Sequence, residues 1–201
     1  MEIFELVIDE EADTYGIQAI SLVEEPAIET DWVALSAQYH FQTVDADRRI
    51  LLGPALIPDK PIYRKRGDEE FHIYFSKDTV RKAMELYFKA GNQSRATLEH
   101  EVPVNGTTVI ESWIVEGEQD KSRMYGLNVP VGTWMVSMKV DSEAIWNEWV
   151  KEGKVKGFSI EGFFTRKVDL SAIPELSAET FVDELEAIIS EAVSKIKSLK
   201  G

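Results

Sequence analysis

The chain has 201 residues, 44% hydrophobic and 29% charged, a composition typical of one soluble globular domain with extensions. Its 22 Lys and Arg against 36 Asp and Glu give a net charge of -14, which argues against nucleic acid as the main partner, because phosphate binding depends on basic side chains. The absence of cysteine excludes disulfides and thiolate sites, and no apolar run approaches the ~18 residues that a membrane helix needs.

The sequence pattern predicts that residues 1–45 form an N-terminal arm or subdomain. Residues 3–8 predict a strand, and an acidic run follows them. Residues 16–28 hold a short apolar stretch that stops at Pro26. Because proline cannot donate to a strand ladder and disfavours a helix before it, this stretch predicts an edge strand or an extended arm.

Residues 46–170 predict the main domain, an α+β fold in which a β-rich barrel is flanked by helices. Apolar or alternating runs predict strands over 50–58, 71–75, 107–115, 133–140 and 155–164. Ser76 predicts the N-cap of a helix that stops at Gly91. A second helix, capped by Asp141 or Ser142, is predicted between the last two strands.

Residues 171–201 predict a C-terminal amphipathic helix, which Ser177 can cap. Its apolar positions recur every three or four residues, with acidic residues early and lysines late, as the helix dipole favours. Two interpretations stay open: the helix packs on the main domain, or it protrudes and binds a partner.

Three histidines, His40, His72 and His100, are the candidates for a catalytic base. His72 alternates within an aromatic strand, which indicates a structural role, and His40 has no evident partner. His100 stands where a strand runs into a turn marked by Pro103 and Gly106, a place where folds present functional side chains. A structural histidine remains the alternative there.

Ser159 lies in the predicted strand 155–164, between Phe158 and Ile160, with glycines on both sides. Glycine leaves room in front of the hydroxyl for a substrate carbonyl. Serine attacks only when a base takes its proton, and histidine suits that role because its ordinary pKa is near neutral. We therefore pair Ser159 with His100, while an ordinary strand serine remains the alternative.

A third group should orient the histidine. Glu111 is an acid inside an otherwise apolar predicted strand, where an unpaired charge is costly, so it is the first candidate. A solvent-facing Glu111 is the alternative interpretation. Glu161 and Glu101 are weaker candidates, because each is so close in sequence to its catalytic neighbour.

Two segments carry a family likeness: Leu-Glu-His-Glu at 98–101 and Gly-Phe-Ser-Ile-Glu-Gly-Phe at 157–163. In this order and spacing they resemble the phage prohead serine proteases, and more narrowly the branch found in prophage-like elements. The segments 16–28, 109–115 and 132–138 agree with this resemblance.

The resemblance implies a fold similar to the herpesvirus assembly protease, a β-barrel ringed by helices. By motif position, His100 corresponds to the family histidine and Ser159 to the family serine, and Glu111 is kept as the third member. A glycine common two residues after the serine is replaced here by Glu161. A backbone N–H near Arg166 corresponds by analogy to an oxyanion donor.

The resemblance further implies a serine endopeptidase that acts without a cofactor or metal. It would cut the scaffold and the major capsid protein precursor inside the phage prohead, in the host cytoplasm, and often itself. A homodimer or higher oligomer follows by analogy with the herpesvirus enzymes. Neither a nucleic acid nor a membrane is expected as a partner.

Two other functions stay open. A structural or scaffold component of the capsid on the same fold would account for most features, including the tail. A metal-dependent hydrolase is less favoured, because the sequence shows no His-x-x-x-His or similar ligand spacing.

Overall fold

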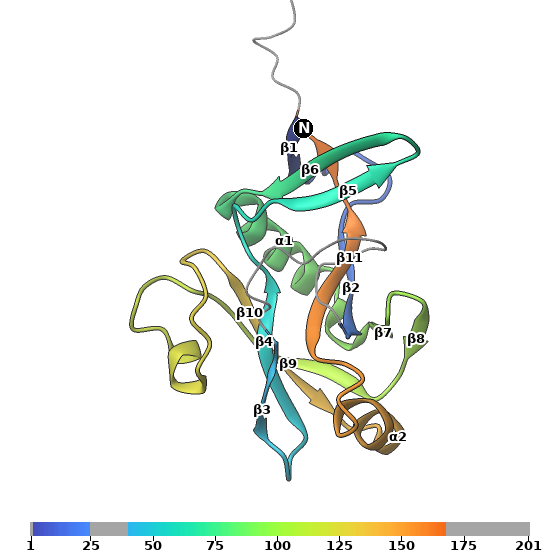
Figure 1. Ribbon diagram of the computed structural model, residues 1–201, viewed down its shortest axis with the longest axis vertical. Coiled ribbons are helices and arrows are strands. Elements are labelled where there is room, and N and C mark those ends of the chain that lie inside the picture. Colours follow the sequence, from blue (N-terminus) through green and yellow to red (C-terminus); the bar gives the residue numbers. More distant parts are fainter. Residues whose placement is uncertain (1, 25–39, 168–201) are drawn as a thin grey trace, which may run out of the picture. The chain divides into compact units, whose positions relative to one another are not determined.

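The computed structural model describes residues 2–24 and 40–167. The predicted helix over 171–201 and the end of the predicted strand at Pro26 lie outside these residues. The described part is mostly β-structure, and its strands form three four-stranded sheets (Figure 1). Helix α1 and several shorter helices connect the strands along the chain.

The first sheet has the order β12-β1-β6-β5. Its strands are β1 Glu2–Val7, β5 Ile62–Arg66, β6 Glu69–Phe75 and β12 Thr165–Arg166. Strand β1 runs parallel to β6 and antiparallel to β12. Residues near the two ends of the described chain therefore lie side by side.

The second sheet has the order β3-β4-β10-β9, with all neighbours antiparallel. Its strands are β3 Gln42–Asp45, β4 Ile50–Leu56, β9 Thr107–Ile114 and β10 Trp134–Val140. The third sheet has the order β11-β2-β7-β8 and consists of β2 Gly16–Val23, β7 Ala96–Leu98, β8 Val102–Val104 and β11 Gly157–Phe163.

The helices between the strands are α1 Lys77–Lys89, η1 Asn92–Ser94, η2 Lys121–Tyr125, α2 Glu143–Ile145 and η3 Trp146–Val150. The predicted helix start at Ser76 is confirmed, because its hydroxyl accepts the Thr79 N–H. Apolar side chains spaced three or four apart on α1 face the core, and the Tyr87 ring packs edge-on against Trp134 at 5.4 Å.

Strand β2 corrects one expectation. Residues 16–23 form an interior strand between β11 and β7, not an edge strand, and its side chains are buried apart from the half-buried Gln18. Residues 2–24, expected in an N-terminal arm, thus supply β1 to the first sheet and β2 to the third. Both faces of β2 are covered, which explains its nearly continuous apolar sequence.

The α+β, β-rich class is confirmed in this coarse form. The described residues form no closed barrel, because each of the three sheets ends in two edge strands. The second and third sheets meet where the Phe41 N–H donates to the Lys156 carbonyl at 2.7 Å and the Phe41 ring packs on Phe158. No helix in the described part is both long and apolar enough to span a bilayer.

Candidate active site

His100 sits at the tip of the hairpin between β7 and β8, in an unusual backbone conformation. Glu99 and His100 have φ angles of 51° and 59°, and the Glu101 N–H closes the turn on the Leu98 carbonyl at 3.0 Å. Two consecutive left-handed residues are typical of type I′ turns, which favour Asn and Gly. With larger side chains, such a conformation costs about 1–3 kcal/mol per residue and persists only where the surrounding structure enforces it.

Strand β2 and Glu24, the residue after it, hold the turn through three hydrogen bonds. The Glu99 N–H donates to the Leu22 carbonyl, and the His100 N–H donates to Ser21 Oγ, each at 3.0 Å. The Glu99 carboxylate accepts the Glu24 N–H at 2.6 Å. Ser21 is fully buried, so the group that holds the His100 backbone is itself fixed by the core.

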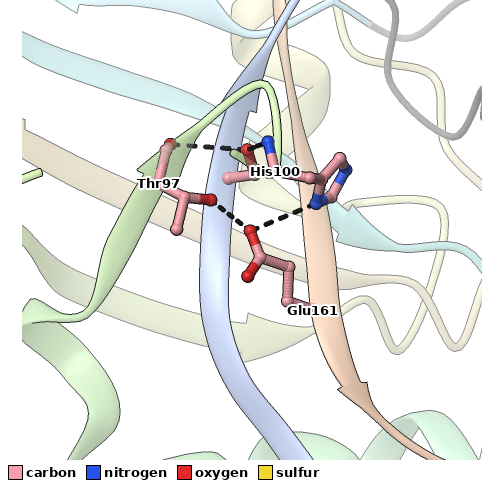
Figure 2. Close-up of polar contacts among 4 residues, drawn as sticks. Thr97, His100 and Glu161 are labelled. Atoms are coloured by element: carbon pink, nitrogen blue, oxygen red, sulfur yellow. Dashed lines mark hydrogen bonds and ion pairs between the residues drawn. The ribbon is translucent and has the colours of Figure 1, made fainter. Parts of the chain in front are cut away.

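The His100 imidazole is oriented by Glu161. Its Nδ1 lies 3.2 Å from Glu161 Oε1, and both side chains are a little under one third exposed. Thr97 Oγ1 donates to the same carboxylate oxygen, so the carboxylate is held from two sides (Figure 2). Because an ionised carboxylate only accepts, Nδ1 carries the proton and Nε2 is left as the acceptor, the tautomer that a general base needs.

Ser159 lies on β11, two residues before Glu161. Side chains two apart on a strand point to the same face, so Ser159 and Glu161 are neighbours on one surface. In the pairing of β11 with β2, Ser159 lies opposite Ser21. The serine is thereby tied to the strand that holds the His100 turn, and the two strands run side by side in Figure 1. Strand β11 is also the edge of its sheet.

Gly162 allows β11 to pack this closely on β2. A Cβ at Gly162 would lie 2.5 Å from the Gly16 carbonyl oxygen and 2.9 Å from Ile17 Cα. The register shifts at this point, between Glu161 and Gly162. This glycine is therefore required by the neighbouring backbone, a different reason from the space for substrate that we expected.

Ser159, His100 and Glu161 all line one cavity of about 510 Å³, a size typical of ligand sites. The cavity is lined by apolar side chains from β1, β4, β5, β6 and β11, with Lys60 and Arg64 as further charged groups. Among these described residues, no hydrogen bond joins Ser159 Oγ to the His100 ring. Such bonds are often long in an unliganded site and tighten when substrate binds.

The structure does not bring Glu111 to His100. The Glu111 carboxylate accepts from Ser137 Oγ at 2.7 Å and pairs with the Lys121 ammonium. The hydrogen bond from Lys121, and then that from Ser137, hold the pKa of Glu111 below its usual value. Glu111 lines a separate groove along α1. The charged partner of Glu111 is thus Lys121, and the carboxylate beside the His100 ring is that of Glu161.

The remaining predicted residues lie elsewhere. The Arg166 guanidinium stacks on the Phe4 and Phe71 rings, 3.9 and 4.7 Å from their centroids, and does not line the cavity. The ring of His72 packs edge-on against Tyr63, and Glu101 is exposed. Within residues 2–24 and 40–167, no three His, Asp or Glu side chains gather as a metal site.

A family model described as "Putative phage serine protease XkdF" matches residues 40–167, which is more than half of the chain. The chain belongs to this phage serine protease family. The matched residues contain His100, Ser159 and Glu161 of this family member, together with β3 to β12. Searches of curated proteins and of solved structures found no match.

Sequence reasoning ranked Glu161 below Glu111 as the orienting acid and did not find the contact of Thr97. Glu161 was set aside because it is close in sequence to Ser159, yet the strand period places residues two apart on the same face. That period was the signal that could have found it. Thr97 gives no such signal, because its contact with Glu161 depends on the parallel pairing of β2 and β7.

Proposed function

We propose that this member of the phage serine protease family is an active serine endopeptidase, with Ser159 as nucleophile, His100 as general base and Glu161 as the group that orients His100. The observation that supports this most directly is the His100–Glu161 contact in the cavity that Ser159 also lines. Base and orienting acid are in the relation that a serine nucleophile requires.

The chemistry follows from these roles. Ser159 Oγ attacks the scissile carbonyl carbon while its proton passes to His100 Nε2, and the Glu161 carboxylate stabilises the imidazolium that forms. The imidazolium then gives its proton to the leaving amine, and an acyl ester on Ser159 remains. A water, deprotonated by Nε2, attacks this ester, releases the new carboxylate and restores the serine.

The edge position of β11 suggests how a substrate binds. Its outer edge has no strand neighbour among the described residues, and residues 158–162 line the cavity. An extended peptide can add to such an edge through main-chain hydrogen bonds, which hold it next to Ser159. We propose this mode of binding for the substrate.

Family membership supports a role in capsid maturation. We propose that the substrates are the scaffold and the major capsid protein precursor, cut inside the prohead in the host cytoplasm. We also propose that the three sheets correspond to the barrel of the herpesvirus assembly proteases, and that the enzyme works as a homodimer or higher oligomer. Contact between the second and third sheets supports the barrel relation.

The test is co-expression of the chain with its cognate capsid protein and scaffold, followed by intact-mass analysis. The wild type should shorten the capsid protein or the scaffold at defined bonds, and Ser159→Ala should leave both intact. A Ser94→Ala variant is the matched control, because Ser94 is exposed, lies in η1 and does not line the cavity. Unprocessed partners with an intact chain retained in particles would instead support a structural component.

A further inference from the structure

Lys60 holds a positive charge beside the candidate active site. It follows β4, after a loop that Asp59 fixes by donating its N–H to the Phe75 carbonyl at 2.8 Å. Its side chain is half-buried and lines the same cavity as Ser159 and His100. Burial lowers the pKa of Lys60, because the charged form loses water.

The Lys60 ammonium has no hydrogen-bond or ion-pair partner within the described residues. The nearby carboxylate in the cavity, Glu161, is already engaged by His100 and Thr97. A half-buried cation without an ion-pair partner interacts favourably with a ligand group of opposite charge, because partial burial strengthens that attraction. Within residues 2–24 and 40–167, no carboxylate pairs with Lys60, so an anionic group of a ligand can take that place.

The charge of the cavity is opposite to that of the chain. The ionisable groups that line it are Lys60, Arg64, His100 and Glu161, so its fixed cations outnumber its carboxylate. The whole chain carries a net charge of -14. A cation such as Lys60 in the cavity of a strongly acidic protein favours a negatively charged group on the ligand.

We infer that Lys60 is a specificity-determining residue that binds the carboxylate of an Asp or Glu side chain in the substrate peptide, close to the scissile bond. This inference rests on the proposed function, because the ligand is taken to be a peptide lying along β11. Apolar side chains such as Leu56, Ile62 and Phe164 line the rest of the cavity and would receive the methylene groups of that residue and its apolar neighbours.

The first experiment measures binding separately from cleavage. Fluorescein-labelled decapeptides of Ala and Leu carry one Glu at each position in turn, and an otherwise identical set carries Gln. Their dissociation constants are measured on full-length Ser159→Ala protein. At one or two positions the Glu peptide should bind about 10- to 100-fold more tightly than its Gln counterpart, the range expected for a charge-assisted hydrogen bond.

The decisive variant is Ser159→Ala combined with Lys60→Met, which removes the charge and keeps an unbranched side chain. The ratio of Glu to Gln affinities should fall to about one. The matched control is Lys65→Met, because Lys65 lies on β5 outside the cavity and pairs with Glu70. That control should keep the ratio, and a thermal melt verifies that each variant folds.

Two outcomes would overturn the inference. A Glu preference that survives Lys60→Met, or the absence of any preference in the parent protein, removes Lys60 from recognition. The second outcome is measured in the chain that keeps Ser159. If Lys60→Met slows cleavage of the Glu peptide and of the Gln peptide by the same large factor, Lys60 acts as a base and does not select the carboxylate. If the wild type cleaves no peptide or capsid protein, the proposed function fails, while the binding ratio still decides whether Lys60 reads a carboxylate.

Discussion

Glu111 and Glu161 are two carboxylates in similar local settings with different partners. Both come from strands, and each accepts one hydrogen bond from a hydroxyl group. Glu111 receives its second contact from Lys121, a lysine side chain at the surface. The result is a salt bridge that helps to hold η2 beside β9.

Glu161 receives its second contact from His100, whose ordinary pKa is near neutral. Histidine is the side chain that most often gains and loses a proton as a general base during catalysis. The comparison teaches that a carboxylate in an apolar strand demands a partner, and that the identity of that partner separates the structural role of Glu111 from the catalytic role that we propose for Glu161. Sequence position alone does not distinguish the two.

The comparison is tested most strongly by removing one charge at a time. Glu161→Gln should lower kcat/KM about 10³- to 10⁴-fold, because the amide no longer fixes the His100 tautomer or stabilises the imidazolium. Glu111→Gln should change kcat/KM less than about twofold, since it touches no part of the cavity. Cleavage rates on the capsid precursor check both, and equal losses would contradict the assignment.

The substitution Gly162→Ala tests the close packing of β11 on β2 next to Glu161. Its new Cβ meets the backbone of Gly16 and Ile17, so the free energy of unfolding should fall by about 1–3 kcal/mol, and activity should fall with it. Gly117→Ala is the control, because nothing lies within 4 Å of its added Cβ. Urea unfolding of both variants gives the comparison, and equal stabilities would show that β11 can shift away from β2.

The smallest expected effect concerns the acid dependence of the Glu111 salt bridge. The pKa of Glu111 is lowered in the folded chain, so its stabilisation is complete above the unfolded pKa and is lost as the pH falls through the folded one. Because this side chain is about half exposed, the difference in unfolding free energy between wild type and Glu111→Gln should be below about 1 kcal/mol at neutral pH. It should vanish once the pH has fallen below the lowered pKa of Glu111, where the carboxyl is protonated in both the folded and the unfolded chain. A difference that persists after this protonation would come from packing.

Much of the fold follows from local sequence. The cap at Ser76, the apolar face of α1 and the main strand runs depend on neighbouring residues, and the structure shows each of them. The sequence also placed His100 at a strand end and Ser159 within a strand, and the structure lines one cavity with both.

What could not be predicted depends on pairing between distant segments. The interior position of β2 requires its parallel pairing with β7, residues that lie far along the chain. The hydrogen bond from the His100 N–H to Ser21 Oγ depends on the same pairing. Local patterns contain no information about such neighbours, so Ser21 gave no signal in the sequence.

Strand β2 has a consequence for any attempt to shorten the protein. It lies between the strand of the serine and the hairpin of the histidine, yet it precedes residue 40, where the family match begins. A chain trimmed to residues 40–167 would keep Ser159, His100 and Glu161 but lose the strand that sets the spacing between them. It would also leave the edges of β11 and β7 that pair with β2 without a partner strand. Because unpaired strand edges pair with other chains, we expect such a fragment to aggregate and to show no cleavage.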